Sequence, residues 1–280
     1  MPWVPELFSS PALAQIEDRH WLDELDAVPY FAGFLTGETN ALIKSFASEP
    51  EVHYPVRGRV KGERAFAAYA AATKGWLEER EATIENTSLL RTERRSIGEG
   101  VLHLRGDEEG RVHLPVAVVV DRRSDGRLDE VRIYYSNWPM TGRHATRPPL
   151  LQPDPELHGS DVVGDYQRAL AAGDVDAILA SFDPGGYARQ PSGGDYVHRG
   201  PAGLRDFYEW LFSNGGGIPL EHCSVTDDGH TCAVEYNVVR WGRTELSPEA
   251  GVAVYVRGES GKLAAARIYD DVDPPLDAAT

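Results

Sequence analysis

The sequence predicts an α+β fold that occurs twice in tandem. Similar segments recur at a nearly constant separation along the 280 residues. Within each copy, helical patterns come first and a run of strand-like patterns follows, which is the order typical of α+β domains. A proline-rich stretch separates the copies, and the length agrees with two domains of about 100–200 residues each.

The repeat has a separation close to 136 residues. Tyr30 recurs 136 residues later as Tyr166, and each tyrosine is followed seven residues on by a glycine and then by an acidic residue. Internal repeats indicate duplicated structural units, so we expect two copies of one domain of about 130 residues. Four further pairs are separated by 135 to 138 residues: Phe46 and Phe182, Pro55 and Pro191, Gly62 and Gly200, and Arg132 and Arg267.

Helical patterns open each copy. Residues 10–25 also carry apolar side chains at helical intervals behind a Ser-Pro start signal, which predicts a helical N-terminal extension. The helix that carries Tyr30 or Tyr166 is expected to end at the glycine that follows, because glycine favours the C-terminal cap. The acidic residue after that glycine opens a second, short helix, and a third helix follows Gly62 or Gly200.

Strand patterns complete each copy. A single short strand is expected between the second and third helices, and four longer strands are expected after the third. The turns at residues 124–126 and 259–261 are typical of hairpins, which indicates antiparallel neighbours. The longer segments are Ala82–Thr92, Gly98–Arg105, Arg111–Asp121 and Leu128–Tyr135 in the first copy, and Leu220–Thr226, Thr231–Trp241, Ala250–Arg257 and Leu263–Asp270 in the second.

The prolines between residues 139 and 159 mark the boundary between the copies. Proline removes a backbone donor, so no regular element is expected to run through this stretch. We predict a first domain at residues 1–142, which includes the helical extension, a linker at 143–159 and a second domain at 160–280. A linker of this length is expected to pack along a domain surface.

The charge balance excludes whole classes of partner. Lys and Arg total 28 against 44 Asp and Glu, a net charge of −16. Nucleic acid and anionic lipid surfaces both need cationic partners, so neither is expected to bind. The sequence has no apolar run of about 18 residues and no secretory signal at its start, which predicts a cytoplasmic protein without a membrane span.

The cysteines and histidines do not predict a metal site. Cys223 and Cys232 are too few for a disulfide framework or a zinc site of their own, and they are expected to be free thiols. No histidine pair has a recognised metal-ligand spacing. We therefore expect no bound metal.

The tyrosine, glycine and acidic pattern, the short strand that ends in proline, and the four-stranded meander resemble the nuclear-transport-factor-2-like superfamily, and its SnoaL-like members in particular. The resemblance covers nearly the whole chain twice. It implies two cone-shaped α+β barrels, each with three helices packed in a strongly bent, mostly antiparallel sheet around an apolar pocket. The superfamily includes polyketide cyclases, ketosteroid isomerases, epoxide hydrolases and proteins that bind without catalysis, so the fold alone does not choose among them.

The resemblance also argues against ketosteroid isomerase chemistry. The tyrosine of that enzyme corresponds to Tyr166, and to Tyr30 in the first copy. Its base aspartate corresponds to Gln190 and Tyr54, and its protonated acid falls near the nonpolar residues 253 and 118. Neither glutamine nor tyrosine can remove a carbon-bound proton at neutral pH, so both copies lack that arrangement.

SnoaL-type cyclases place an acid-base aspartate on a late strand, and Asp270 resembles it. Because side chains alternate along a strand, Ile268 and Asp270 are expected to face the pocket, whereas Arg267 faces solvent. A carboxyl group in that apolar setting gains a raised pKa, as a general acid or base needs. Tyr135 stands at the same place in the first copy. The competing interpretation is a solvated acidic strand end, and Asp271 is expected to point outward.

These residues predict a cofactor-free cyclase or isomerase that acts on a hydrophobic small molecule. Asp270 would move the proton, and Tyr166 would donate a hydrogen bond to the developing oxyanion. Alternatives are a binding or scaffold protein without chemistry, and an epoxide-opening cyclase or hydrolase in which Asp195 approaches Asp270. Members of this family usually dimerise through the open face of the sheet. We therefore expect the two copies to pair with each other within one chain, so that the protein is a monomer. The expected ligand-binding residues are Gln190, Tyr236, Asp195, Tyr30, Tyr54 and Tyr135.

Overall fold

A computed structural model describes residues 39–56, 58–106, 110–159, 161–192 and 196–276. The chain divides into two compact units, Met1–Tyr135 and Ser136–Thr280. The helix expected at residues 10–25, and the predicted site residues Tyr30 and Asp195, lie outside the described residues. No helix in the described part of the chain is both long and apolar enough to cross a membrane.

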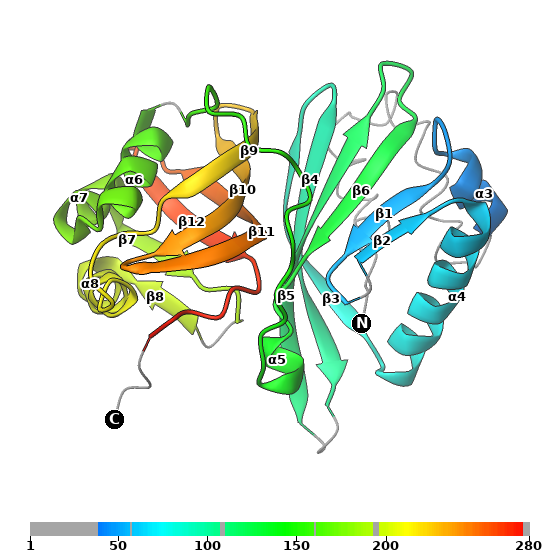
Figure 1. Cartoon of the computed structure of the whole chain (residues 1–280), viewed down its shortest axis with the longest axis horizontal. Coiled ribbons are helices and arrows are strands. Elements are labelled where there is room, and N and C mark those ends of the chain that lie inside the picture. Colours follow the sequence, from blue (N-terminus) through cyan, green and yellow to red (C-terminus); the bar gives the residue numbers. More distant parts are fainter. Residues whose placement is uncertain (1–38, 57, 107–109, 160, 193–195, 277–280) are drawn as a thin grey trace. The chain divides into compact units, whose positions relative to one another are not determined.

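The first unit contains one six-stranded sheet in the order β2-β1-β6-β5-β4-β3 (Figure 1). Neighbouring strands are antiparallel except β1 and β6, which are parallel. The long helix α4 buries an aromatic stripe that includes Phe66, Tyr69 and Trp76. The elements are α3 (Thr39–Lys44), β1 (Glu51–Tyr54), β2 (Gly58–Lys61), α4 (Glu63–Glu79), β3 (Thr83–Arg91), β4 (Arg95–Arg105), β5 (Arg111–Arg122) and β6 (Leu128–Tyr134).

The second unit repeats this topology with the order β8-β7-β12-β11-β10-β9. Its one parallel pair, β7 with β12, corresponds to β1 with β6 in the first unit. The two sheets therefore confirm the predicted tandem α+β fold. The elements are α5 (Trp138–Thr141), α6 (Asp161–Ala172), α7 (Val175–Ser181), β7 (Phe182–Arg189), β8 (Val197–Arg199), α8 (Gly200–Leu211), β9 (Leu220–Asp227), β10 (Thr231–Trp241), β11 (Thr244–Arg257) and β12 (Leu263–Tyr269).

Local sequence explains the helices that precede the second sheet. Gly173 ends α6 in a left-handed conformation at φ +71, and a Cβ there would lie 2.9 Å from the backbone of Gly216. The carboxylate of Asp174 then caps α7 by accepting a hydrogen bond from the backbone N–H of Ala177 at 3.0 Å. Figure 1 shows α6, α7 and α8 gathered against one side of the sheet.

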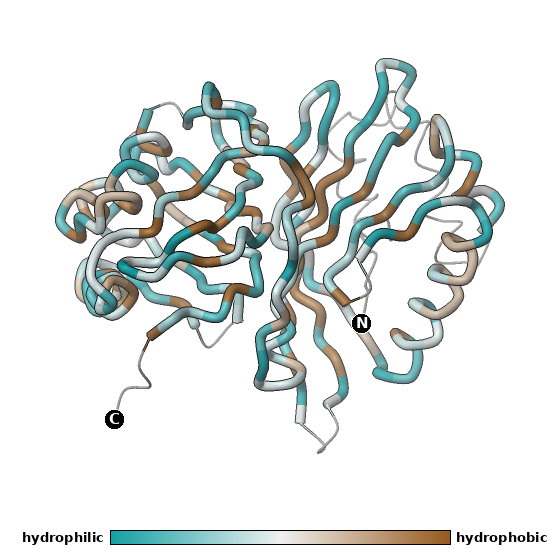
Figure 2. The backbone as a smooth tube through the Cα atoms, in the orientation of Figure 1, coloured by the Kyte–Doolittle hydropathy of each residue, from teal (hydrophilic) through white to brown (hydrophobic). Residues whose placement is uncertain are grey.

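The four long strands of each copy lie where the sequence predicts them, and alternating hydropathy is visible along them in Figure 2. The prediction of one short strand between the second and third helices was incomplete. Each unit has a hairpin there, formed by β1 with β2 and by β7 with β8. A strand of three or four residues is too short to show a clear period, which explains why the second strand of each hairpin was missed.

The proline-rich segment after the first sheet forms hydrogen bonds within the second unit. The backbone N–H of Ala250 donates to the carbonyl of Arg147 at 2.9 Å, and that of Asp154 donates to the carbonyl of His222 at 2.8 Å. Residues 136–142, which were expected to close the first domain, also belong to the second unit. The segment therefore follows the surface of that unit.

Candidate functional site

The second unit contains a cavity of about 480 Å³. This volume lies within the usual range for small-molecule sites, about 300–1,000 Å³. Polar groups on its wall include Asp270, His144 and Gln190. Aromatic and aliphatic side chains make up much of the wall, among them Tyr166, Leu170, Phe207, Tyr208, Val238 and Ile268.

Strand alternation places Asp270 at this cavity. Ile268 near the end of β12 lines the wall, and Asp270 lines it two residues later. The adjacent strand β10 presents Tyr236 and Val238 to the same space. Asp270 and Tyr236 both line the cavity, on the side that strand alternation predicts for them.

Among the described residues, Asp270 is held by a side-chain hydrogen bond from Tyr236 and by a backbone hydrogen bond from Val272. The hydroxyl group of Tyr236 donates to Oδ2 of Asp270 at 2.8 Å. Burial is the main cause that raises the pKa of the Asp270 carboxyl to about 6. The hydrogen bond from Tyr236 opposes this shift, and the charge of Asp271 contributes to it. The carboxyl group therefore titrates within reach of neutral pH.

A glycine on β11 creates the space for Tyr236. Gly251 lies opposite Tyr236 in the β10–β11 register. A Cβ atom at Gly251 would lie 2.7 Å from the ring of Tyr236 and 2.8 Å from its hydroxyl oxygen. The ring can therefore lie flat across the neighbouring strand and reach Asp270 only because this position lacks a side chain.

Tyr166 lines the cavity but its hydroxyl group pairs with another tyrosine. Its oxygen lies 2.8 Å from that of Tyr208, and either group can be the donor. Burial raises the pKa of Tyr166 to about 12, while the bond to Tyr208 lowers it slightly, so the phenol stays protonated at neutral pH. Tyr255 packs beside it at 5.3 Å between ring centroids, which continues the aromatic wall.

Gln190 also lines the cavity, and its amide has a partner. Its Nε2 lies 2.7 Å from Nε2 of His198. The imidazole of His198 is stacked on Phe207 at 4.2 Å between ring centroids. The residue at the position of the isomerase base is thus held by a hydrogen bond and cannot itself accept a carbon-bound proton.

Asp271 does not point outward, so that prediction was wrong. Only 3 % of its surface is exposed. The Ser136 hydroxyl donates to its Oδ1 at 2.6 Å, the Asn137 amide donates to its Oδ2 at 2.9 Å, and the backbone N–H of Ala145 donates to Oδ2 at 2.9 Å. These donors come from the segment after the first sheet, and they compensate the burial of the charge.

The prediction that the Arg267 face of the last strand meets solvent was also wrong. Arg267 is 5 % exposed, and its guanidinium donates to the hydroxyl of Tyr187 at 3.2 Å. On the same face, the guanidinium of Arg189 lies 4.6 Å from the ring centroid of Tyr269. Aromatic and cationic side chains from neighbouring strands bury one another there, so alternation gave the correct cavity face but the wrong exposure for the opposite face.

Trp138 and His144 are among the cavity residues that the sequence reasoning missed. Both line the wall. They lie in residues 136–145, which carry no repeat signal and which the sequence assigns to the end of the first domain and the start of a linker. Only their contacts in the folded unit reveal them.

In the first unit, the predicted ligand residues Tyr54 and Tyr135 are both buried. The Tyr54 ring packs 4.8 Å from that of Tyr69. The Tyr69 hydroxyl has no hydrogen-bond partner among the described residues, although its side chain is fully enclosed. These tyrosines therefore take part in the packing of this unit, and any ligand contact by them stays a prediction.

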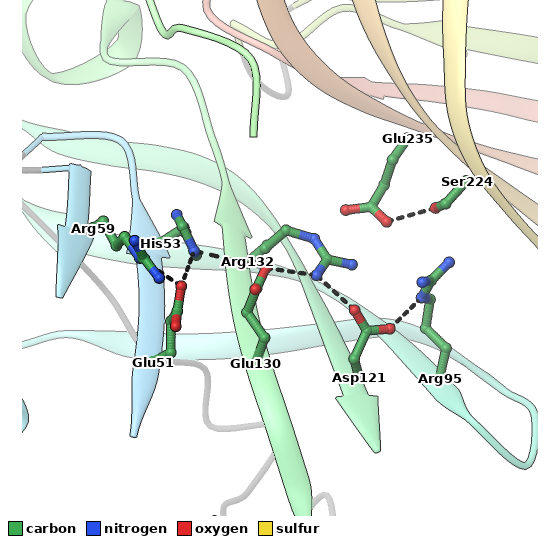
Figure 3. A network of polar contacts seen from close by, with 9 residues as sticks. All are labelled: Glu51, His53, Arg59, Arg95, Asp121, Glu130, Arg132, Ser224 and Glu235. Atoms are coloured by element: carbon green, nitrogen blue, oxygen red, sulfur yellow. Dashed lines mark hydrogen bonds and ion pairs between the residues drawn. The ribbon is translucent and has the colours of Figure 1, made fainter. Parts of the chain in front are cut away.

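One face of the first sheet carries a charged network, in which Arg132 is buried with only 1 % of its surface exposed (Figure 3). Glu51, His53 and Glu130 place ligand atoms within 4.8 Å of one another, a set of oxygen and nitrogen donors that suits a divalent cation. However, Arg59 donates to Glu51 at 2.5 Å and lowers the pKa of that carboxyl to about 2. Arg132 likewise pairs with Glu130 at 2.8 Å, so both carboxylates are already neutralised by cations.

The second unit also matches a known family. Residues 163–266 match the sequence profile of the SnoaL-like domain. These residues form a SnoaL-like domain. The profile match covers β7 to β11 and most of β12, but ends before Asp270 and does not include residues 136–145. The first unit has the same strand order, which is consistent with two such folds in tandem.

Solved structures with similar folds cover about two fifths of the chain. One is a candidate polyketide cyclase of Sinorhizobium meliloti, with 21% identity and a TM-score of 0.33 over 38% of this chain and 92% of that chain. Another is SalBIII, an epoxide hydrolase/cyclase-like enzyme of pyran ring formation in salinomycin, with 18% identity and a TM-score of 0.33 over 41% and 91%. A third is a protein of Catenulispora acidiphila with a ketosteroid isomerase-like fold in complex with trimethylamine, with 17% identity and a TM-score of 0.33 over 40% and 85%. No curated protein matches the chain.

Proposed function

We propose that the SnoaL-like domain binds a hydrophobic small molecule and moves a proton on it, as a cyclase or isomerase does, with Asp270 as the general base. The observation that carries the proposal is the carboxyl group of Asp270 on the wall of a cavity rich in aromatic side chains. A carboxyl with a pKa of about 6 is ionised at neutral pH and is a stronger base than an exposed aspartate.

The neighbours of Asp270 support this assignment. The hydroxyl group of Tyr236 donates to Oδ2 of Asp270 at 2.8 Å, which holds the carboxylate on the cavity wall. The paired hydroxyl groups of Tyr166 and Tyr208 supply a donor to a substrate oxygen, since one of the two protons is not used within the pair. The chemistry would be removal of a proton from the carbon beside a carbonyl group, followed by ring closure or reprotonation.

The test is deuterium exchange on 2-tetralone, a bicyclic apolar ketone with acidic α-protons. Proton NMR in D₂O measures the loss of the α-proton signal with and without the protein. We expect the wild-type chain to accelerate exchange and Asp270→Asn to reduce the catalysed rate by about 10²–10⁴-fold, the usual contribution of a general base. Asp206→Asn, which removes an exposed carboxylate on α8, is the matched control. Equal rates for the wild type and Asp270→Asn would contradict the proposal.

A second candidate function is binding without chemistry. The observation that favours it is Gln190, which occupies the position of the isomerase base and is held by His198. Native mass spectrometry after incubation with 2-tetralone distinguishes the two functions. Retention of the ketone without any exchange would favour a binding protein, whereas exchange that depends on Asp270 favours the enzyme.

A further inference from the structure

We propose that His144 is a second acid-base residue of this cavity, held in place by Asp271, and that it donates a proton to a substrate oxygen while Asp270 removes one from carbon. This inference rests on the proposed function of Asp270. It concerns a residue outside the part of the chain that matches the SnoaL-like family. The substrate class that it implies is an apolar molecule with a carbonyl group next to an acidic C–H bond.

The imidazole ring of His144 has a defined place on the cavity wall. His144 lines the cavity together with Trp138. The two rings are stacked, with 4.9 Å between centroids and an interplanar angle of 26°. The imidazole is therefore part of the cavity wall and is held against the indole ring of Trp138.

The imidazole ring of His144 is hydrogen-bonded to Asp271. Nδ1 of His144 lies 3.0 Å from Oδ1 of Asp271. An ionised carboxylate only accepts, so Nδ1 must carry the proton, and Nε2 is the nitrogen left for a ligand. Among the described residues, no hydrogen bond engages Nε2. This is how a carboxylate fixes the tautomer of a catalytic imidazole.

Asp271 is itself held in place by several donors. Donors from Ser136, Asn137 and the backbone of Ala145 hold both of its oxygens. The carboxylate is thereby fixed at the end of β12 and cannot turn away from the imidazole. Asp271 is a positioning residue, because it acts on the substrate only through His144.

Three carboxyl groups influence the charge of the His144 ring. Burial lowers the pKa of His144, but the hydrogen bond and charge of Asp271, together with the charges of Asp273 and Asp270, outweigh burial and raise the pKa overall. The raised pKa increases the fraction of His144 that is protonated at a given pH, while Asp270, with a pKa of about 6, is ionised at neutral pH. These two protonation states are the ones that a base and an acid need for one concerted step.

Atoms, protons and electron pairs balance in the proposed step. The carboxylate of Asp270 takes the α-proton, the electrons of the C–H bond form the C=C bond of the enol, and the carbonyl π electrons move to oxygen. That oxygen takes the proton from Nε2 of the His144 imidazolium. Asp270 ends as the neutral acid, and His144 ends as the neutral imidazole with its Nδ1 proton still directed to Asp271.

The kinetic test uses the full chain and 2-tetralone exchange in D₂O. We expect His144→Gln to lower the catalysed rate by about 10²-fold. It should also remove the fall in rate at high pH that marks loss of the imidazolium proton. His230→Gln is the matched control, because its side chain is exposed on the turn between β9 and β10. Circular dichroism verifies that each variant is folded.

A second measurement does not depend on turnover. Long-range ¹H–¹⁵N NMR of the imidazole groups reports the tautomer of His144 at high pH, with His144→Gln used to assign the signal. We expect the Nδ1–H tautomer, and we expect 2-naphthol, an apolar analogue of the enol, to shift the Nε2 signal. A neutral His144 in the Nε2–H tautomer would overturn the proposal.

The outcomes separate the two proposals. If Asp270→Asn slows exchange and His144→Gln does not, His144 has no role in the step and only the inference fails. If neither substitution changes the rate, the proposed function fails and this inference fails with it. If both substitutions slow exchange and the Nδ1–H tautomer is observed, both proposals are supported.

Discussion

The carboxyl group of Asp270 costs the folded protein stability at neutral pH. Its pKa rises from the ordinary aspartate value of 3.8 to about 6 in the folded chain, so the folded state binds the proton more tightly than the unfolded state does. Stability is therefore expected to fall as pH rises from about 4 to about 6 and to stay lower above that range. A functional carboxylate that opposes folding is typical of an active site.

Asp270→Asn is accordingly predicted to stabilise the protein at pH 7. The neutral amide avoids the burial of a charge. We expect the free energy of unfolding to rise by about 1–3 kcal/mol, because each unit of pKa shift corresponds to about 1.36 kcal/mol. Urea unfolding at pH 7 and at pH 4 measures the effect. The gain should be present at pH 7 and largely absent at pH 4, where the wild-type carboxyl is already protonated. A loss of stability at pH 7 would contradict the raised pKa.

Tyr236→Phe is predicted to raise the pKa of Asp270 further. The hydrogen bond from Tyr236 favours the ionised carboxylate and lowers the pKa of Asp270. Without this donor, the effect of burial on the pKa is larger. The rise in 2-tetralone exchange with pH, which follows ionisation of the base, should move to higher pH. Tyr187→Phe is the control, since its hydroxyl pairs with Arg267 on the opposite face of the sheet. An unchanged profile in Tyr236→Phe would show that the bond does not tune Asp270.

At the scale of an element, the pairing of β10 with β11 determines the geometry of the site. The register brings Gly251 opposite Tyr236, and the missing side chain lets the ring cross the neighbouring strand. The site therefore depends on a strand position that carries no functional group.

Gly251→Ala is predicted to displace the Tyr236 ring and weaken its bond to Asp270. The added methyl group would contact the ring at 2.7 Å, and overpacking of this kind costs about 1–3 kcal/mol. Thermal unfolding should show the loss, and the pH profile of exchange should shift as in Tyr236→Phe. Gly185→Ala on β7 is the control, because a Cβ there meets no atom within 4 Å. Equal unfolding temperatures and equal pH profiles in the two variants would show that Gly251 does not make room for the Tyr236 ring.

At the scale of the whole molecule, the segment after the first sheet completes the second unit. It supplies the donors that bury Asp271 and places His144 and Trp138 on the cavity wall. We propose that the functional boundary between the domains lies near residue 136, before this segment, and not at residue 160.

Two fragments test that boundary. A fragment of residues 136–280 is predicted to be more stable than one of residues 160–280 by about 1–3 kcal/mol, since the shorter fragment loses several hydrogen bonds to Asp271, Ala250 and His222. Urea unfolding of the two fragments measures the difference. Equal midpoints and slopes would place the boundary at the later residue.

The sequence by itself determined the tandem α+β fold, the eight long strands, and the orientation of Asp270 and Tyr236 toward one space. These features follow from local rules, because alternation and turn signals act over a few residues. Only the tertiary structure decided that Asp271 is buried and that His144 joins the site. Asp271 lies 127 positions from His144 along the chain. No local period reaches that far, and the burial of a charge depends on donors that the fold alone brings to it.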